Sequence, residues 1–285
     1  MQRVHVGSGA TRGALGVFPV WGEVDIERDY STAFGDAYVS EQATPDVATL
    51  MVANTGSRPL LLLEGQVLEG GWQNRMVARS LVVEPNDEVA VDVVCVEAGR
   101  WSGQRHHADF RRRASTRVQA GVRAGNSRQS EVWSRVSEYE TRYGANATSS
   151  FSEHANRAAD DVSRLTQGLR PFPGQIGIVV AISGYPLSAE VFDTPATLAD
   201  QYQSIVAAAA MDAVGRPAED TPSRRVRRFI DRATKVPLRR TVTAGAGVAF
   251  AGDTEDASIS LLRWRCRDVH TSLLNPRHEL VGSSK

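Results

Sequence analysis

The sequence predicts an α+β fold with a β-rich N-terminal half, a helical middle and strands that return near the C-terminus. Two observations support this prediction. Short runs of β-branched residues recur between turn residues over 1–101, and the apolar residues of the middle of the chain then adopt helical spacing. With 285 residues, of which 41% are hydrophobic, the chain can bury a sizeable core.

Six segments of the N-terminal half are predicted to be strands, because each is short, rich in β-branched residues and bounded by turn residues. In the last of them Val89, Val91, Val93 and Cys95 share one face, and the other face is also largely apolar, as in a strand covered on both sides. Glycines between 64 and 75 predict a tight strand–turn–strand excursion. The six predicted strands are 16–20, 37–41, 47–52, 59–63, 77–84 and 89–97.

The remaining segments alternate between helices and strands. A basic loop with a helical part at 110–118 is expected over 102–126. Helices are predicted at 128–143, 152–169, 195–214 and 222–234, and strands at 174–184, 247–250 and 258–268. No linker forces a boundary, so we expect one domain over 1–285, with a possible division into a β-rich part, 1–101, and a mixed part, 128–285.

The charge balance is zero overall but uneven along the chain. There are 33 Lys+Arg against 33 Asp+Glu, and the basic side chains are nearly all arginine, which genome composition explains. The segments 100–128 and 224–240 each carry a net charge of +7, which leaves −14 on the rest. Complementary surfaces within the chain or between copies are the favoured explanation, and a homo-oligomer is expected. Nucleic acid is disfavoured, because neither segment interleaves aromatic residues for stacking.

Several classes of protein are disfavoured by absent motifs. No stretch approaches the length of a membrane-spanning helix, and no secretory leader is predicted. The two isolated cysteines favour a reducing, cytoplasmic location. Dinucleotide-binding, phosphate-loop and zinc-protease motifs are missing, and adjacent His106 and His107 would point in opposite directions on a strand. We therefore expect no cofactor and no metal.

The most informative region is 64–101, where polar side chains surround turns at the ends of apolar strands. As a functional site, these carboxylates and guanidiniums would suit acid–base chemistry or the binding of a phosphorylated ligand. The structural alternative is that Arg75 and Arg100 pair with Glu69 and Glu97 to close the turns. Trp72 and Trp101 flank the cluster and would either stack on a ligand or belong to the core. The polar members are Glu64, Glu69, Gln73, Arg75, Glu97 and Arg100.

Two motifs in this region, EGQVLEGGWQNR at 64–75 and VDVVCVEAGRW at 91–101, resemble a prokaryotic domain family. The family is named for its association with ADP-ribosylglycohydrolases and the rhodanese-phosphatase superfamily. Asn74 stands where the family often has Asp. The resemblance extends to 174–195 and to Met211 and the two residues after it, and so covers most of the chain. It implies an ADP-ribose- or NAD-linked context without assigning a reaction.

Two functional hypotheses follow. In the first, the protein binds or processes a small nucleotide-derived anion such as ADP-ribose: Arg75 and Arg100 hold phosphate or fix an acid, Gln73 orients the ligand and Trp101 contacts it. Glu97 or Glu69 is the general base. In the second, the protein is a non-catalytic assembly or adaptor module that self-associates or docks on acidic partners through its arginine-rich segments. Whether the protein is an enzyme is left undecided by the residues alone.

Overall fold

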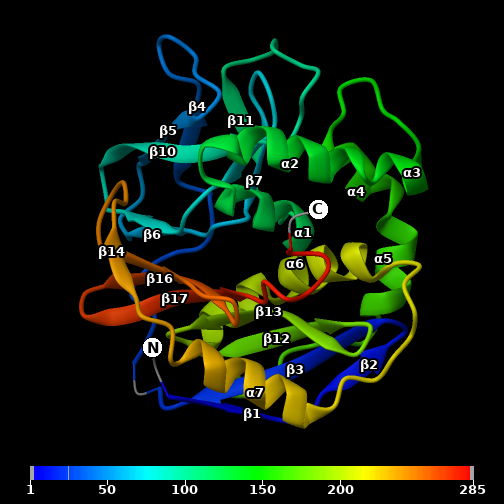
Figure 1. The fold of residues 1–285 in the computed structure, drawn as a ribbon. Helices are drawn as coiled ribbons and strands as arrows, with labels where there is room; N and C mark the ends of the chain where they lie inside the picture. The colour runs from blue at the N-terminus through cyan, green and yellow to red at the C-terminus, as the bar shows by residue number, and fades with distance from the viewer. Residues whose placement is uncertain (1–2, 25, 283–285) are drawn as a thin grey trace. The chain divides into compact units, whose positions relative to one another are not determined.

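The computed structural model describes residues 3–24 and 26–282 of the chain, which is a mixture of helix and strand (Figure 1). Two compact units can be distinguished within it. Unit 1 combines both ends of the chain, 1–28, 161–242 and 247–285, and unit 2 comprises 29–160 together with 243–246. The prediction of a single folding domain over 1–285 therefore stays a prediction.

Unit 1 is built on a nine-stranded antiparallel sheet, with the strand order β1-β3-β12-β13-β17-β16-β15-β14 and with β2 paired to β3. Its helices are α6 and α7, and α5 begins in unit 2 and ends in unit 1. The elements are β1 Val4–Val6, β2 Ala10–Arg12, β3 Leu15–Gly22, α5 Ala159–Thr166, β12 Gly177–Ile182, β13 Tyr185–Phe192, α6 Pro195–Ala213, α7 Ser223–Ala233, β14 Arg239–Thr241, β15 Val248–Asp253, β16 Ser258–Trp264 and β17 Arg267–Leu274.

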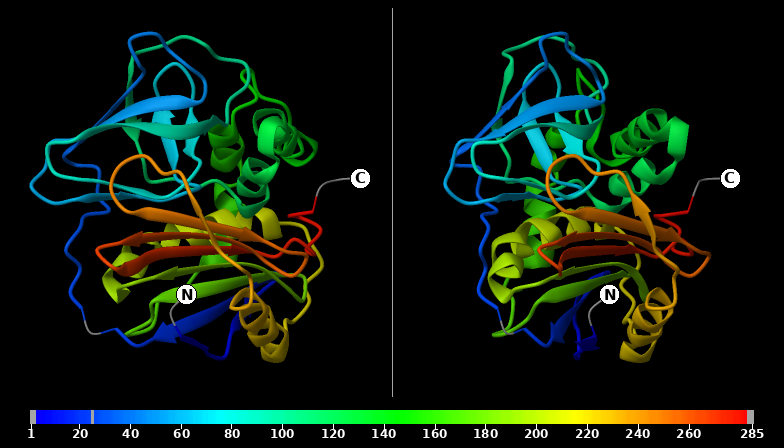
Figure 2. Two further views of the ribbon diagram at one scale, coloured as in Figure 1. Left: turned by 60° about the vertical axis from the view of Figure 1, so that its left-hand side comes forward. Right: turned by 90° about the vertical axis from the view of Figure 1, so that its left-hand side faces the viewer.

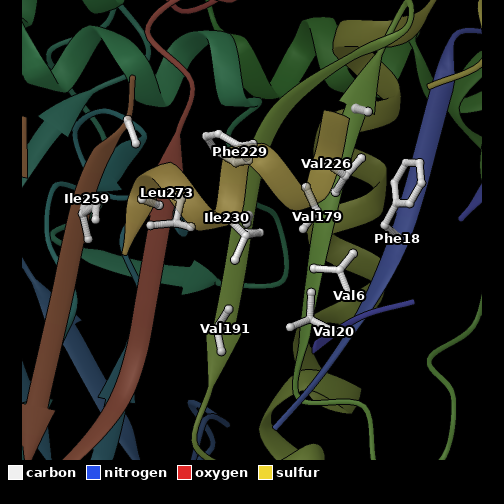
Figure 3. Packing of buried hydrophobic residues seen from close by; sticks show 14 of the residues in the cluster. Val6, Phe18, Val20, Val179, Val191, Val226, Phe229, Ile230, Ile259 and Leu273 are labelled. Carbon is white, nitrogen blue, oxygen red and sulfur yellow. The ribbon is translucent and has the colours of Figure 1, made fainter. Parts of the chain in front are cut away.

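The two helices of unit 1 cover opposite faces of the sheet (Figures 2 and 3). Val226, Phe229 and Ile230 of α7 pack on one face, against alternate residues of β3, β12 and β13 such as Val179 and Val191 (Figure 3). Helix α6 begins as the sequence predicts, with Pro195 in its first turn and the Thr194 hydroxyl accepting a bond from the Thr197 N–H. The sheet is thus buried between two helices.

Unit 2 contains a closed six-stranded barrel, ordered β10-β5-β4-β11-β7-β8, and a separate two-stranded sheet, β6-β9. Short helices make up the rest of the unit. The elements are β4 Ala37–Ser40, β5 Thr49–Asn54, β6 Leu60–Leu62, β7 Val67–Gly70, β8 Arg75–Val77, β9 Leu81–Val83, β10 Glu88–Cys95, β11 His106–Asp109, α1 Thr116–Ala120, η1 Gly121–Arg123, η2 Gly125–Ser127, α2 Arg128–Ser137, α3 Glu140–Tyr143 and α4 Phe151–Arg157.

The barrel interior is apolar and follows the alternation of its strands. Every second residue of β10 faces inward, and Val91 and Val93 are fully buried, as the sequence predicts for that strand. They pack with Val39 of β4, Leu68 of β7 and Val77 of β8. The inward direction of each strand is therefore known, which fixes where its polar residues point.

The structure corrects several predicted elements. Strand β13 was not predicted, because its alternation is obscured by two buried polar residues, Ser188 and Glu190. The predicted basic loop at 102–126 contains strand β11 and begins helix α1 only at Thr116. Predicted strand 77–84 divides between β8 and β9, and predicted helices 128–143 and 152–169 divide into α2 with α3 and α4 with α5. No helix within the described residues is both long enough and apolar enough to cross a membrane.

Candidate functional site

The candidate site lies at one rim of the barrel of unit 2, where the ends of all six strands meet. Strands β4, β7 and β10 end at this rim, and β5, β8 and β11 begin there, because neighbouring strands are antiparallel. The loops that join these strands therefore gather at the same end of the barrel. Polar residues placed at the strand ends are brought together although they are distant in the sequence.

An inward-facing polar layer follows the apolar layers of the barrel at this rim. Arg75 of β8 is the register partner of both Leu68 and Cys95, and His107 of β11 is the partner of Val39. Glu41 follows Val39 by two residues and so points to the same side. The alternation that directs valines and leucines into the core thus directs a guanidinium, a thiol, an imidazole and a carboxylate into the mouth of the barrel.

Arg75 is the largest fully buried side chain of this layer, with none of its surface exposed. Its Nε donates a hydrogen bond to the Val47 carbonyl at 3.1 Å. Its nearest carboxylate oxygen is Glu41 Oε1, 3.8 Å from Nη2, which is too long for a hydrogen bond. Burial lowers the pKa of Arg75, but a guanidinium keeps its charge at neutral pH. Both terminal nitrogens therefore carry a buried charge without a hydrogen-bond partner among the described residues.

Glu41 and His107 complete the buried charge cluster. Glu41 Oε1 accepts a hydrogen bond from the Trp72 N–H at 3.0 Å and lies 3.6 Å from His107 Nε2. Burial alone would raise the pKa of Glu41, but His107, the Trp72 N–H and Arg75 together hold it below its ordinary value. The carboxylate is consequently ionised at neutral pH. His106, the neighbour of His107, bonds instead to the Tyr38 hydroxyl at 2.8 Å.

Unpartnered polar atoms gather at the rim. Gln73 donates through Nε2 to the Glu97 carbonyl at 2.9 Å, whereas its Oε1 is buried and has no partner among the described residues. Buried polar groups in native proteins are nearly always hydrogen-bonded, so several exceptions at the ends of neighbouring strands make this rim the candidate site. The atoms concerned are Glu41 Oε2, Gln73 Oε1, Arg75 Nη1, Arg75 Nη2 and His107 Nε2.

Glu97 and Arg100 form a bidentate clamp on the turn between β7 and β8. Arg100 Nη2 and Nε lie 2.7 and 3.0 Å from the two oxygens of Glu97, and Arg100 also donates to the carbonyls of Gly70 and Gly71. Glu97 further accepts bonds from the Asn74 N–H at 3.0 Å and the Thr148 hydroxyl at 2.7 Å. Burial alone would raise the pKa of Glu97, but these bonds lower it. The pair predicted between Arg100 and Glu97 is confirmed.

Glu69 lies outside this cluster. It belongs to β7 but points away from the barrel interior, because its neighbour Leu68 points inward. Its Oε1 accepts bonds from Arg112 Nε at 2.6 Å and from the Ser152 hydroxyl at 2.5 Å. The predicted pairing of Arg75 with Glu69 is therefore wrong: Arg75 faces Glu41, and Glu69 pairs with Arg112. The backbone N–H of Glu64 donates to the Ser80 hydroxyl at 2.9 Å.

Two tryptophans lie next to the polar layer. The Arg75 guanidinium carbon is 5.5 Å from the centre of the Trp101 ring, within cation–π range. Trp72 meets the same ring edge-on at 5.4 Å. Trp101 is 44% exposed although it covers a fully buried arginine. An exposed aromatic ring over a buried charge is a surface on which a planar ligand can stack.

Close approach at Gly71 shapes the rim. Gly71 has a φ of +55°, and a Cβ at this position would lie 2.1 Å from His107 Nε2. Any other residue would therefore strain the backbone and displace the imidazole. The glycine pair of the motif at 64–75 thus allows His107 to reach Glu41.

Of the six predicted site residues, Gln73 and Arg75 carry buried atoms without hydrogen-bond partners among the described residues, and Trp101 lies over the Arg75 guanidinium. Glu97 and Arg100 hold the adjoining turn, and Glu69 lies elsewhere. The sequence interpretation missed Glu41 and His107. Continuing the alternation from Val39 by one more step would have indicated Glu41, whereas no local pattern marks His107. Within the described residues, no three histidine, cysteine or acidic side chains converge on a possible metal position.

The fold and the site define a strand-rich protein of mixed helix and strand, whose small barrel carries a buried, incompletely hydrogen-bonded polar cluster at one rim. The chain belongs to the ARG and Rhodanese-Phosphatase-superfamily-associated Protein domain family, whose model matches residues 3–274. This family is associated with ADP-ribosylglycohydrolase and rhodanese-phosphatase systems. No curated protein and no solved structure shows significant similarity to the chain.

Proposed function

We propose that the barrel rim of unit 2 binds a small anionic ligand derived from a nucleotide, in an ADP-ribose- or NAD-linked pathway. The observation that carries the proposal is the fully buried guanidinium of Arg75, whose two terminal nitrogens have no hydrogen-bond partner among the described residues, together with unpartnered atoms of Glu41, Gln73 and His107. Leaving such groups unsatisfied costs about 1–3 kcal/mol each, more for charged ones, which a bound ligand would recover. A cytoplasmic location, favoured by two unpaired cysteines, is part of the proposal.

The proposed roles differ among the predicted residues. Arg75 and Gln73 contact the ligand, and Trp101 stacks on it. Glu97 and Arg100 act as positioning residues, because nearly all of their bonding capacity is spent on the turn that presents Gln73 and Arg75. The carboxylate inside the rim is that of Glu41. It is neither Glu69 nor Glu97, the two residues that the sequence suggested as the general base.

Calorimetric titration and thermal-shift measurements with ADP-ribose, NAD and AMP test the proposal. We expect saturable binding of at least one of them to the wild-type chain and its loss in Arg75→Met. Arg142→Met is the matched control, because Arg142 is an exposed arginine of the same unit. If no nucleotide binds the wild type, or if both variants bind equally, the proposal fails.

A second candidate function, self-association through arginine-rich surfaces, is favoured by one observation on α7. Arg224, Arg227 and Arg228 are exposed, and no carboxylate pairs with them among the described residues. By contrast, four of the eight arginines of the other basic segment are paired within unit 2, with Glu97, Glu69, Glu138 and Asp92. We propose that this face of α7 docks on an acidic surface of a second copy.

Light scattering across ionic strengths tests this second candidate. The wild type is expected to form an oligomer that dissociates as salt rises, because screening weakens contacts between exposed charges. Arg224→Ser/Arg227→Ser/Arg228→Ser should be monomeric. Lys235→Ser/Arg239→Ser/Arg240→Ser removes the same charge from nearby exposed positions and should still assemble. A wild type that stays monomeric at every salt concentration excludes the hypothesis.

A further inference from the structure

We propose that the group which enters the rim is a hydroxyl-bearing sugar, the ribose of the ligand, and that the phosphate stays outside at Arg105. This inference rests on the proposed function and adds the orientation of the ligand and the group that the rim recognises. The juxtaposition of acceptors without donors and a guanidinium whose terminal nitrogens form no hydrogen bond, at the end of the barrel, carries it.

Acceptors make up much of the unpaired set. Glu41 Oε2 and Gln73 Oε1 can only accept hydrogen bonds, because an ionised carboxylate has no proton and an amide oxygen is never a donor. His107 Nδ1 lies 3.0 Å from the Leu68 carbonyl, which can only accept, so Nδ1 carries the proton. A fully ionised phosphate would face Glu41 Oε2 and Gln73 Oε1 with oxygens of its own.

The charge of Arg75 is already balanced inside the rim. Glu41 lies 3.8 Å away, and Asp46 also contributes a favourable electrostatic interaction with the same guanidinium. Bringing a dianion into this buried position would leave its charge uncompensated, which is costly in a medium of low polarity. A neutral group that accepts from Arg75 and donates to the carboxylate needs no extra counter-charge.

The vicinal hydroxyls of a ribose meet these requirements. One hydroxyl oxygen can accept from Arg75 Nη1 or Nη2 while the O–H groups donate to Glu41 Oε2 and Gln73 Oε1. A carboxylate that accepts bonds from ribose hydroxyls is a recurrent feature of nucleotide sites. The sugar would then lie beneath Trp101, whose ring must move aside, since it covers the buried Arg75 and is itself exposed.

The phosphate position follows from Arg105. This exposed arginine lies in the segment between Trp101 and β11, and its Nη2 donates to the carbonyl of Gln42, the residue after Glu41. That bond places Arg105 at the outer edge of the same rim. No carboxylate pairs with it among the described residues, so its remaining donors can hold a phosphate in contact with solvent.

The test compares three probes by calorimetry on the wild-type chain: ribose 5-phosphate, 2-deoxyribose 5-phosphate and inorganic phosphate. We expect ribose 5-phosphate to bind about tenfold to a hundredfold more tightly than the deoxy sugar, the usual effect of losing one hydrogen bond to a charged group. Inorganic phosphate should bind more weakly than ribose 5-phosphate. In Glu41→Gln the preference for ribose should disappear. Glu88→Gln, at the opposite end of β10, should keep it.

Equal affinities for the two sugars, or inorganic phosphate binding as tightly as ribose 5-phosphate, would overturn the inference while leaving the proposed function intact. Absence of binding by either sugar phosphate would overturn it as well. The nucleotide panel described above then decides the proposed function separately. The comparison of sugars uses only wild-type protein, so it remains decisive if Glu41→Gln does not fold.

Discussion

Arg75 Nη2 lies 3.8 Å from Glu41 Oε1 in the mouth of the barrel, and neither side chain has any exposed surface. Arg75 begins β8, and Glu41 directly follows β4. The two side chains form no hydrogen bond with each other. A buried pair with such loose geometry recovers only part of what its burial costs. It is better explained as a site prepared for a ligand than as a device for stability.

Removing Arg75 alone should destabilise the protein strongly, because Glu41 would remain as a buried carboxylate without its cation. We expect Arg75→Met to lower the free energy of unfolding by about 3–5 kcal/mol, measured by urea denaturation. Arg142→Met should change it by no more than about 0.5 kcal/mol. A loss for Arg75→Met as small as that of the control would mean that water reaches this charge.

Gly71→Ala should lower the free energy of unfolding more than Gly125→Ala, a substitution at another glycine with a positive φ. Gly125 has a φ of +61° and open space around its missing Cβ, whereas a Cβ at Gly71 would meet His107. Gly125→Ala should cost about 1 kcal/mol, from backbone strain alone. Gly71→Ala should cost at least about 1 kcal/mol more, from displacement of the imidazole. Equal losses in thermal denaturation would contradict the close approach.

The clamp on the β7–β8 turn predicts different outcomes for two substitutions of Glu97. Glu97→Ala removes the carboxylate that accepts from the Asn74 N–H and from Arg100, and about 2 kcal/mol of stability should be lost, since Arg100 is partly exposed and keeps its bonds to the carbonyls of Gly70 and Gly71. Glu97→Gln keeps one acceptor oxygen and should lose less. If Glu97→Gln abolished ligand binding at unchanged stability, Glu97 would have a direct role in the site.

Stability should fall in acid because of Glu41 and Glu97. The pKa values of both carboxyl groups are lower in the folded protein than the ordinary value of 4.5, so the folded state binds fewer protons than the unfolded chain. Their contribution is present above pH 4.5 and is lost as the pH falls through the folded values. Urea midpoints measured from neutral pH downward should show this decline, and Glu41→Gln/Glu97→Gln should flatten it.

Ligand binding should be visible in the fluorescence of Trp101, because the proposed ligand displaces this ring from the Arg75 guanidinium. Trp101→Phe should remove most of the fluorescence change caused by ADP-ribose. Trp21→Phe, in unit 1, is the control and should leave the change intact. A signal that survives in Trp101→Phe would place the ligand away from this rim.

Local periodicity predicted much of the barrel but not its closure. The inward face of β10, from Val89 to Cys95, was readable because alternation depends only on neighbouring residues along one strand. The position of β11 could not be predicted from the sequence, because His106–Asp109 lacks a run of β-branched residues and pairs with strands distant in sequence. The partners of Arg75 therefore could not be predicted from the motif at 64–75 alone.

The same limit explains the mixed outcome for the site residues. Arg100 and Glu97 are three residues apart, so their pairing follows from spacing. Glu69 and Arg75 are also close in sequence, yet they lie on opposite faces of a hairpin and cannot meet. Only the register of β7 against β8 and β11 separates them.

The most direct test of the rim as a nucleotide-binding site is a calorimetric titration of ADP-ribose into the wild type, Glu41→Gln and Glu88→Gln. We predict saturable binding to the wild type and to Glu88→Gln, and an affinity at least about tenfold lower for Glu41→Gln, the effect of losing one bond to a charged group. No binding to the wild type, or the same affinity for all three proteins, would contradict the assignment of the site.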